Sequence, residues 1–242
     1  MPYTLAHPAA VLPLRSASRR YLALAPLAIG ATMPDVQYFI RLSAEGHFTH
    51  TLPGLLLVCL PVGWLVLLLF DRFGRAGVAA LLPSQWRLPA APASRPFWLT
   101  SVALFAGSVT HVVWDAFTHD YGLFVRAWPA LKSPVIASVP GLPWYSALQL
   151  GSTIFGMLAL AAAVWPWVRA QPSVEMPQLV VRMSAVLSAL AIAAFLNGSR
   201  FLHSGTRSFI VAGGVAVTFA VAVGLVAIGW WTTRSASDGR VS

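Results

Sequence analysis

The feature that most constrains this chain is a series of long apolar blocks that carry almost no charge. About 20 helical residues are needed to cross a hydrocarbon core about 30 Å thick. Four blocks meet this length (residues 52–70, 97–117, 148–168 and 209–233), and residues 179–197 form a fifth, with Arg182 near enough to its start to reach the head groups. Only 10% of the residues are charged, against about 25% in soluble domains, which excludes an ordinary water-soluble enzyme.

The sequence therefore predicts an all-α fold, a polytopic transmembrane helical bundle with five spans in one integral membrane domain over residues 1–242. Pro61 lies inside the first block and should bend that helix. Residues 71–96 contain four prolines and four arginines, so they are expected to form an irregular basic connection. Residues 120–147, rich in proline and aromatic residues, should form a second long loop at the membrane surface.

The N-terminal apolar segment, residues 21–39, is the poorest of the series because Pro26, Pro34 and Asp35 interrupt it. It is predicted to be either a sixth crossing or a helix lying at the interface. Counting Lys and Arg on the two sides of the membrane gives eight against eight if the segment does not cross, and eleven against five if it does. The positive-inside rule therefore favours a crossing, with both termini cytoplasmic.

Histidines and carboxylates gather where two of the predicted spans meet one membrane face. His111, Asp115 and His119 are spaced four residues apart and line one stripe at the end of the 97–117 block. His47 and His50 come directly before the 52–70 block. Because two successive crossings return the chain to the face from which it started, the start of the first block and the end of the second share a face.

Asp35 lies only about a dozen residues upstream of His47 and can reach the same place. Histidine with carboxylate suits Zn²⁺, Mn²⁺ or Fe²⁺, and catalytic zinc typically has three protein ligands and an open position for water. The simpler interpretation is that each residue is an interfacial polar side chain or a helix cap. For the set this interpretation is weaker, since His and Asp are costly at membrane depth and here they converge, so spacing alone leaves a metal site as an equal alternative.

The order of four strings resembles a bacterial membrane family. These are TLAH at 4–7, MPD at 33–35, GHFTHT at 46–51 and THVVWDAFT at 110–118, supported by MPYTLAHPAA at the start and PWYSALQLGS at 143–152. They resemble the inner-membrane metal-dependent hydrolases related to zinc-dependent phospholipase C. The chain looks still more like the uncharacterised family known as domain of unknown function 4184. The likeness covers roughly residues 1–155 and does not draw on the last two spans.

The resemblance implies a ligand set for the metal, consisting of His7, Asp35, His50, His111 and Asp115, with His47 and His119 as catalytic neighbours. Where the hydrolases commonly show a second Asp and a His after the Pro-Asp pair, this chain has Gln37 and Tyr38, which argues against a full two- or three-metal centre. A ligand role for His7 also requires that residues 21–39 do not separate it from Asp35. On the ligand pattern we expect His7 to join the others.

Two functions remain open at this stage. In the first, the chain is a hydrolase of the bacterial inner membrane: a divalent metal, zinc before Mn or Fe, activates water to attack an ester or phosphoester of a lipid-like substrate, with His119 or His47 as the acid or base. Arg41, Arg126 and Lys132 would then hold phosphate on the same face. In the second, it is a non-catalytic membrane protein that binds a metal, lipid or protein partner. No basic surface for nucleic acid and no nucleotide-binding loop is evident.

Overall fold

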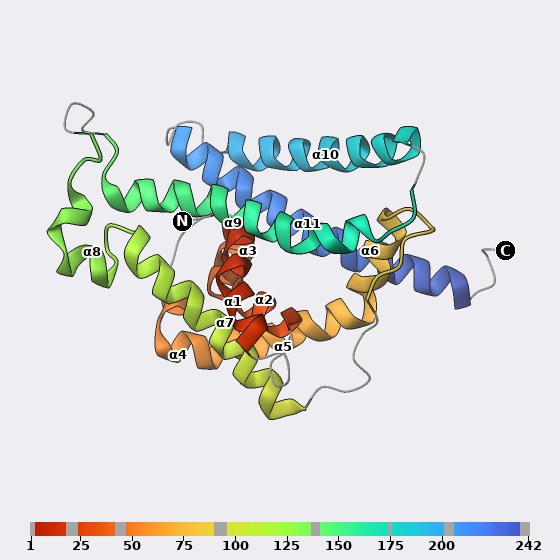
Figure 1. The fold of residues 1–242 in the computed structure, drawn as a ribbon, viewed down its shortest axis with the longest axis horizontal. Coiled ribbons are helices and arrows are strands. Elements are labelled where there is room, and N and C mark those ends of the chain that lie inside the picture. Colours follow the sequence, from red (N-terminus) through yellow and green to blue (C-terminus); the bar gives the residue numbers. More distant parts are fainter. Residues whose placement is uncertain are drawn as a thin grey trace. The chain divides into compact units, whose positions relative to one another are not determined.

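The computed structural model describes residues 3–17, 24–41, 47–89, 96–136, 141–173, 176–200 and 206–237 (Figure 1). Every regular element in these ranges is helical, apart from one isolated bridge between Pro134 and Pro143, which confirms the all-α prediction. The helices are η1 (Thr4–Val11), α1 (Leu12–Ala17), α2 (Leu24–Gly30), η2 (Met33–Asp35), α3 (Val36–Arg41), η3 (Phe48–His50), α4 (Leu52–Gly54), η4 (Leu55–Cys59), α5 (Leu60–Leu69), η5 (Phe70–Gly74), α6 (Arg75–Leu81), α7 (Phe97–Thr118), α8 (Leu123–Ala127), η6 (Pro129–Lys132), α9 (Trp144–Arg169), α10 (Met176–Ser199) and α11 (Thr206–Ser237).

Four stretches of the described residues have the length and composition of membrane spans: Leu52–Leu81, Phe97–Ala127, Trp144–Arg169 and Ala212–Ser235. They coincide with the four strongest apolar blocks of the sequence. The fifth predicted span, residues 179–197, lies within the 24-residue helix α10, of which Val186–Ser199 qualifies as a shorter apolar helix. The chain is thus a helical membrane protein with at least four candidate spans.

The first span is longer than its sequence suggested. The expectation of an irregular connection from residue 71 is wrong for its first part, because the helix continues through η5 and α6 to Leu81. No proline occurs between Pro61 and Pro83, and Arg75 Nε donates to Asp71 Oδ1 at 3.0 Å across one helical turn. The π-helical turn η4 ends two residues before Pro61, where the helix has to accommodate a residue without an N–H group.

The N-terminal segment does not form one straight helix. Residues 24–41 are divided into α2, η2 and α3, with a turn at Ala31 and Thr32 between the first two. Residues 21–23, at the start of the predicted segment, lie outside the described residues. The break follows from Pro34, whose ring cannot continue the α2 hydrogen-bond pattern, and it returns the chain sharply towards α7.

The described helices belong to two compact units. The first contains residues 1–36, 47–64 and 95–166, and the second contains residues 37–46, 65–94 and 167–242. In the second unit α11 packs closely on the first span, since a methyl group at Gly77 would overlap the carbonyl oxygen of Leu225 and one at Gly229 would overlap that of Phe73. Such glycine contacts are typical of helix pairs in membranes.

In the first unit α2 lies directly against α7. A methyl group at Gly30 would overlap the carbonyl oxygen of Leu104, and one at Gly107 would overlap that of Leu27. Ser108 Oγ donates to the carbonyl of Gly30 at 3.0 Å. The two backbones therefore touch without side chains between them, and this contact brings the turn after α2 to the middle of α7.

The contacts between two connections predict on which membrane face each connection lies. In the second unit Arg87 N donates to Gln171 Oε1 at 2.9 Å, and Trp86 Nε1 donates to the carbonyl of Pro172 at 3.1 Å. The connections after the first and third spans therefore lie at one membrane face. Reporter fusions after residues 85 and 173 should agree with each other, and a fusion after residue 130 should report the opposite side. Agreement between 85 and 130 would contradict the assignment of Phe97–Ala127 as a span.

Candidate metal centre

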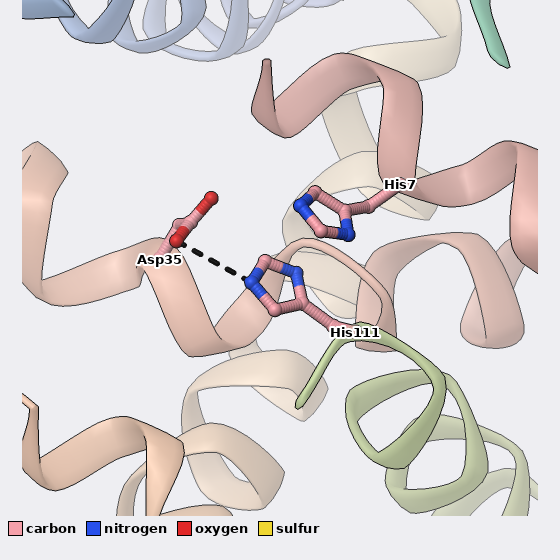
Figure 2. Close-up of side chains that lie close together, drawn as sticks. All are labelled: His7, Asp35 and His111. Carbon is pink, nitrogen blue, oxygen red and sulfur yellow. Dashed lines mark ion pairs between the residues drawn. The ribbon is translucent and has the colours of Figure 1, made fainter. Parts of the chain in front are cut away.

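Five predicted ligands come together inside the first unit from four separate segments. His7 lies on η1, Asp35 in η2, His50 in η3, and His111 and Asp115 on α7. His7, Asp35, His111 and Asp115 are buried, and His50 is nearly so, with 11% of its side chain exposed. Figure 2 shows three of them, with Asp35 and His7 turned towards the imidazole of His111 from different segments. We call these five residues the His/Asp cluster.

The distances between the nitrogen and oxygen atoms of the His/Asp cluster resemble those between the ligands of one metal ion. His111 Nε2 lies 3.5 Å from Asp35 Oδ1 and 3.4 Å from Asp115 Oδ2, and His50 Nε2 lies 3.7 and 3.5 Å from the same two oxygens. A direct hydrogen bond between charged groups would be shorter, at about 2.7–2.9 Å. Two ligand atoms at about 2.0–2.2 Å from a tetrahedral zinc lie about 3.3–3.6 Å apart. The four separations are thus close to the distance expected between two ligand atoms of one tetrahedral zinc.

His7 completes the His/Asp cluster from the N-terminus. Its ring stacks on that of His111 with the centroids 3.6 Å apart, and its Nε2 lies 3.7 Å from Asp115 Oδ1. His7, Asp35 and His111 each offer one ligand atom within 4.8 Å of the others, and so do His50, His111 and Asp115. The two sets share His111, which makes this residue the centre of the arrangement.

Main-chain and hydroxyl groups orient the ligand atoms. His111 Nδ1 lies 2.7 Å from the carbonyl of Ala31, and because a carbonyl only accepts, Nδ1 carries the proton and Nε2 faces the carboxylates. Thr4 Oγ1 donates to Asp35 Oδ2 at 2.6 Å, which turns Oδ1 towards His111 and His50. Partners of this kind fix the rotamer and basicity of metal ligands in proteins.

Thr4 and the Ala31 carbonyl were not predicted from the sequence, although the spacing of Thr4 and His7 could have indicated that Thr4 lies at the site. Residues three apart eclipse each other on a 3₁₀-helix, so Thr4 and His7 project from the same side of η1. Thr49 is a further residue that the sequence did not assign to the site. Its hydroxyl donates to the carbonyl of Pro34 at 2.5 Å, which ties η3 to the segment that carries Asp35.

Several buried atoms of the His/Asp cluster have no hydrogen-bond partner in the part of the chain that the structure describes. They are both ring nitrogens of His7, Asp35 Oδ1, His111 Nε2 and both carboxylate oxygens of Asp115. Buried polar atoms are normally paired, and an unpaired one calls for a bound water or ion. Two buried carboxylates among imidazoles therefore form a donor set that fits a divalent cation in both charge and chemistry.

Two of these groups lie outside the candidate spans, and their protonation follows from burial and neighbours. Burial lowers the pKa of His7 to about 3, and the charge of His111 acts in the same direction. His7 is therefore neutral at physiological pH, with a lone pair on one ring nitrogen. Burial by itself would raise the pKa of Asp35, but the nearby positive charge of His111 outweighs burial and lowers the pKa.

The two histidines predicted to be catalytic lie differently. His119 follows the last residue of α7 and is buried, with Nδ1 at 3.0 Å from the carbonyl of Asp115 and at 3.7 Å from its Oδ1. His47 is exposed and is not part of the His/Asp cluster. The ring of Tyr121 contacts both, with centroids 5.1 Å from His119 and 4.8 Å from His47. The structure therefore brings His119, but not His47, into contact with the cluster.

Of the three basic side chains predicted to hold phosphate, two lie in the described part of the chain. Arg126 on α8 and Lys132 on η6 are both exposed, and the structure does not bring either into the His/Asp cluster. The side chain of Arg41 lies outside the described part of the chain.

The fold and the site together define a polytopic helical membrane protein with a buried cluster of histidine and aspartate inside its first unit. The chain belongs to the family described as Domain of unknown function (DUF4184), whose model matches residues 1–233. The match reaches well beyond residue 155, so the estimate that the last spans add nothing to the likeness is wrong. No curated protein and no solved structure matches the chain.

Proposed function

We propose that this protein is a membrane-bound, metal-dependent hydrolase that acts on an ester or phosphoester of a lipid-like substrate at the membrane interface. The observation that carries the proposal is the convergence of His7, Asp35, His50, His111 and Asp115, whose mutual separations of 3.4–3.7 Å suit ligands around one centre. The second unit contributes none of these residues.

The donor set favours zinc, with manganese or iron as alternatives, because all candidate ligands are imidazoles and carboxylates. A divalent ion held there would supply an activated water and would polarise the oxygen of the bond to be cleaved. The five residues exceed the three protein ligands typical of catalytic zinc. His50 is the most exposed of the five, and we place the substrate on its side of the cluster.

His119 is the best-placed general base or acid. Its Nδ1 contacts the Asp115 carbonyl and its buried Nε2 has no partner among the described residues, so that nitrogen is available to exchange a proton with substrate or water. Tyr121, 45% exposed and in contact with His119, forms the outer edge of the site towards His47.

The position in the membrane favours an amphiphilic substrate. His111 and Asp115 lie within the last third of α7, and α8 with its exposed Arg126 follows after a short turn, at the end of the span where head groups would lie. We extend the proposal to the bacterial inner membrane, the location that the sequence resemblance implies. The alternative is a non-catalytic protein in which the cluster binds a metal, lipid or partner for assembly.

Hydrolysis assays separate the two functions. Detergent-purified protein, loaded with Zn²⁺, Mn²⁺ or Fe²⁺, is assayed for turnover of para-nitrophenyl esters, bis-para-nitrophenyl phosphate and phospholipids in mixed micelles. We expect turnover that chelation abolishes, and His119→Gln should lower kcat about 100-fold or more while metal content is unchanged, because a positioned acid or base contributes about 10²–10⁴. His47→Gln is the matched control. A metal-loaded wild type that cleaves none of these substrates would support the non-catalytic alternative.

A further inference from the structure

A cavity of about 520 Å³ opens beside the His/Asp cluster, entirely within the first unit. Its walls come from η1, from α7 at Trp114 and from α9 between Trp144 and Gly156. Cavities that bind small molecules typically measure about 300–1,000 Å³. The lining is almost wholly apolar, and the residue that links it to the cluster is His7, which belongs to both.

Small residues create this space. Ala6, Ala9 and Ala10 line it from η1, and Ala147, Gly151 and Gly156 line it from α9. At Gly156 the two helices nearly touch, because a methyl group there would lie 3.1 Å from the carbonyl oxygen of Ala6, the residue before His7. At Gly151 such a methyl group would meet only the ring of Phe155, at 4.0 Å. The cavity is thus open at Gly151 and closed at Gly156.

The length of the cavity matches one leaflet of a bilayer. Trp144 begins α9 and is 45% exposed, as expected for a tryptophan at head-group level. Gly156 lies twelve residues further along the same helix, which corresponds to about 18 Å at 1.5 Å per residue. Half of a hydrocarbon core is about 15 Å deep. The cavity therefore extends from the interface to about the bilayer midplane.

We propose that this cavity binds one hydrocarbon chain of a membrane lipid, with the closed end of the cavity beside His7 of the His/Asp cluster. A sugar or a peptide would leave its polar groups unpaired against an apolar wall, at a high cost in a membrane. Hydrocarbon chains are also the apolar groups that surround α7 and α9, two of the candidate spans. The link between the bound chain and turnover rests on the proposed function, whereas the assignment of the hydrocarbon chain rests on the cavity alone.

Photolabelling tests the chain-binding site without requiring activity. The probe is a phosphatidylcholine with a diazirine in the middle of one palmitoyl chain, added in mixed micelles and mapped on the protein by mass spectrometry. In the wild type, we expect labelling to concentrate on peptides that contain residues 4–11 and 144–156. Gly151→Leu should fill the cavity and lower that labelling at least fivefold. Gly224→Leu is the matched control, because a methyl group at Gly224 of α11 meets nothing within 4 Å.

The outcomes distinguish this inference from the proposed function. Labelling spread over all candidate spans according to their exposure, or labelling unchanged by Gly151→Leu, would overturn the chain-binding site. Metal content and turnover are measured on the same preparations. Concentrated labelling in a wild type that binds no metal would support the cavity and contradict the hydrolase. Metal-dependent turnover with diffuse labelling would support the hydrolase and contradict the cavity.

Discussion

Replacing His111 with alanine is expected to remove the metal from the purified protein. His111 Nε2 contacts both carboxylates of the His/Asp cluster, and its ring also stacks on that of His7. The substitution therefore removes the ligand that the two candidate ligand sets share. In metal-replete buffer, we expect about one equivalent of zinc in the wild type and less than about a tenth of that in His111→Ala, because one site is formed and loss even of an outer partner costs about 10–100-fold in affinity.

His47→Ala is the matched control for this measurement. It removes the same type of side chain from the same region of the chain, but His47 is exposed and is not part of the His/Asp cluster, so the metal content should be unchanged. Asp115→Asn is a second test that preserves volume and removes one ligand charge. Elution volume and circular dichroism show whether each variant is folded. Zinc retained by folded His111→Ala and Asp115→Asn, or absent from the wild type, would contradict the metal centre.

Replacing Gly107 with leucine is expected to cause the largest loss of stability. The Cβ position of Gly107 overlaps the Leu27 carbonyl and lies 2.7 Å from Ala31 N, so no larger residue fits unless α2 moves away from α7. Overpacking typically costs about 1–3 kcal/mol or more, and contact with rigid backbone places this site at the upper end. For a chain of this size about 3 kcal/mol corresponds to a fall in Tm of about 6–12 °C.

Tm in detergent measures this effect, with Gly224→Leu as the control that adds the same side chain to a glycine that has no close neighbour. The control should stay within about 2 °C of the wild type, as expected for substitutions away from packed contacts. Gly107→Leu should also lose metal, because Ala31, whose carbonyl orients His111, directly follows α2. A Tm equal to that of the control would mean that α2 does not lie against α7 in this way.

The local part of the candidate site could be predicted from the sequence. His111 and Asp115 are one helical turn apart, and a span that continues through both residues makes their contact unavoidable. Topology extended this to His50, because two successive spans share a face at their outer ends. The four candidate spans could likewise be identified from the sequence, since a span is recognised from the composition of about 20 consecutive residues.

The end of the first span was predicted less well. The charges of Asp71, Arg72 and Arg75 suggested a connection, but they lie on a helix that continues to Leu81. Charged residues end a membrane core without ending a helix, because backbone hydrogen bonds continue wherever no proline or turn intervenes. A hydropathy pattern therefore locates the membrane boundary and not the end of the helix.

The position of His7 is where the charge pattern and the tertiary structure diverge, whereas the family resemblance had led us to expect His7 among the other ligands. Composition determined by itself that this is a helical membrane protein, and residue spacing with the order of the spans placed His111, Asp115 and His50 at one face. The charge count favoured a crossing by residues 21–39, which would have placed His7 on the opposite face. The tertiary structure instead breaks this segment after α2 and stacks His7 on His111. The deciding contacts, Gly30 with Leu104 and Gly107 with Leu27, join backbones far apart in the chain, and no local pattern encodes such a pairing.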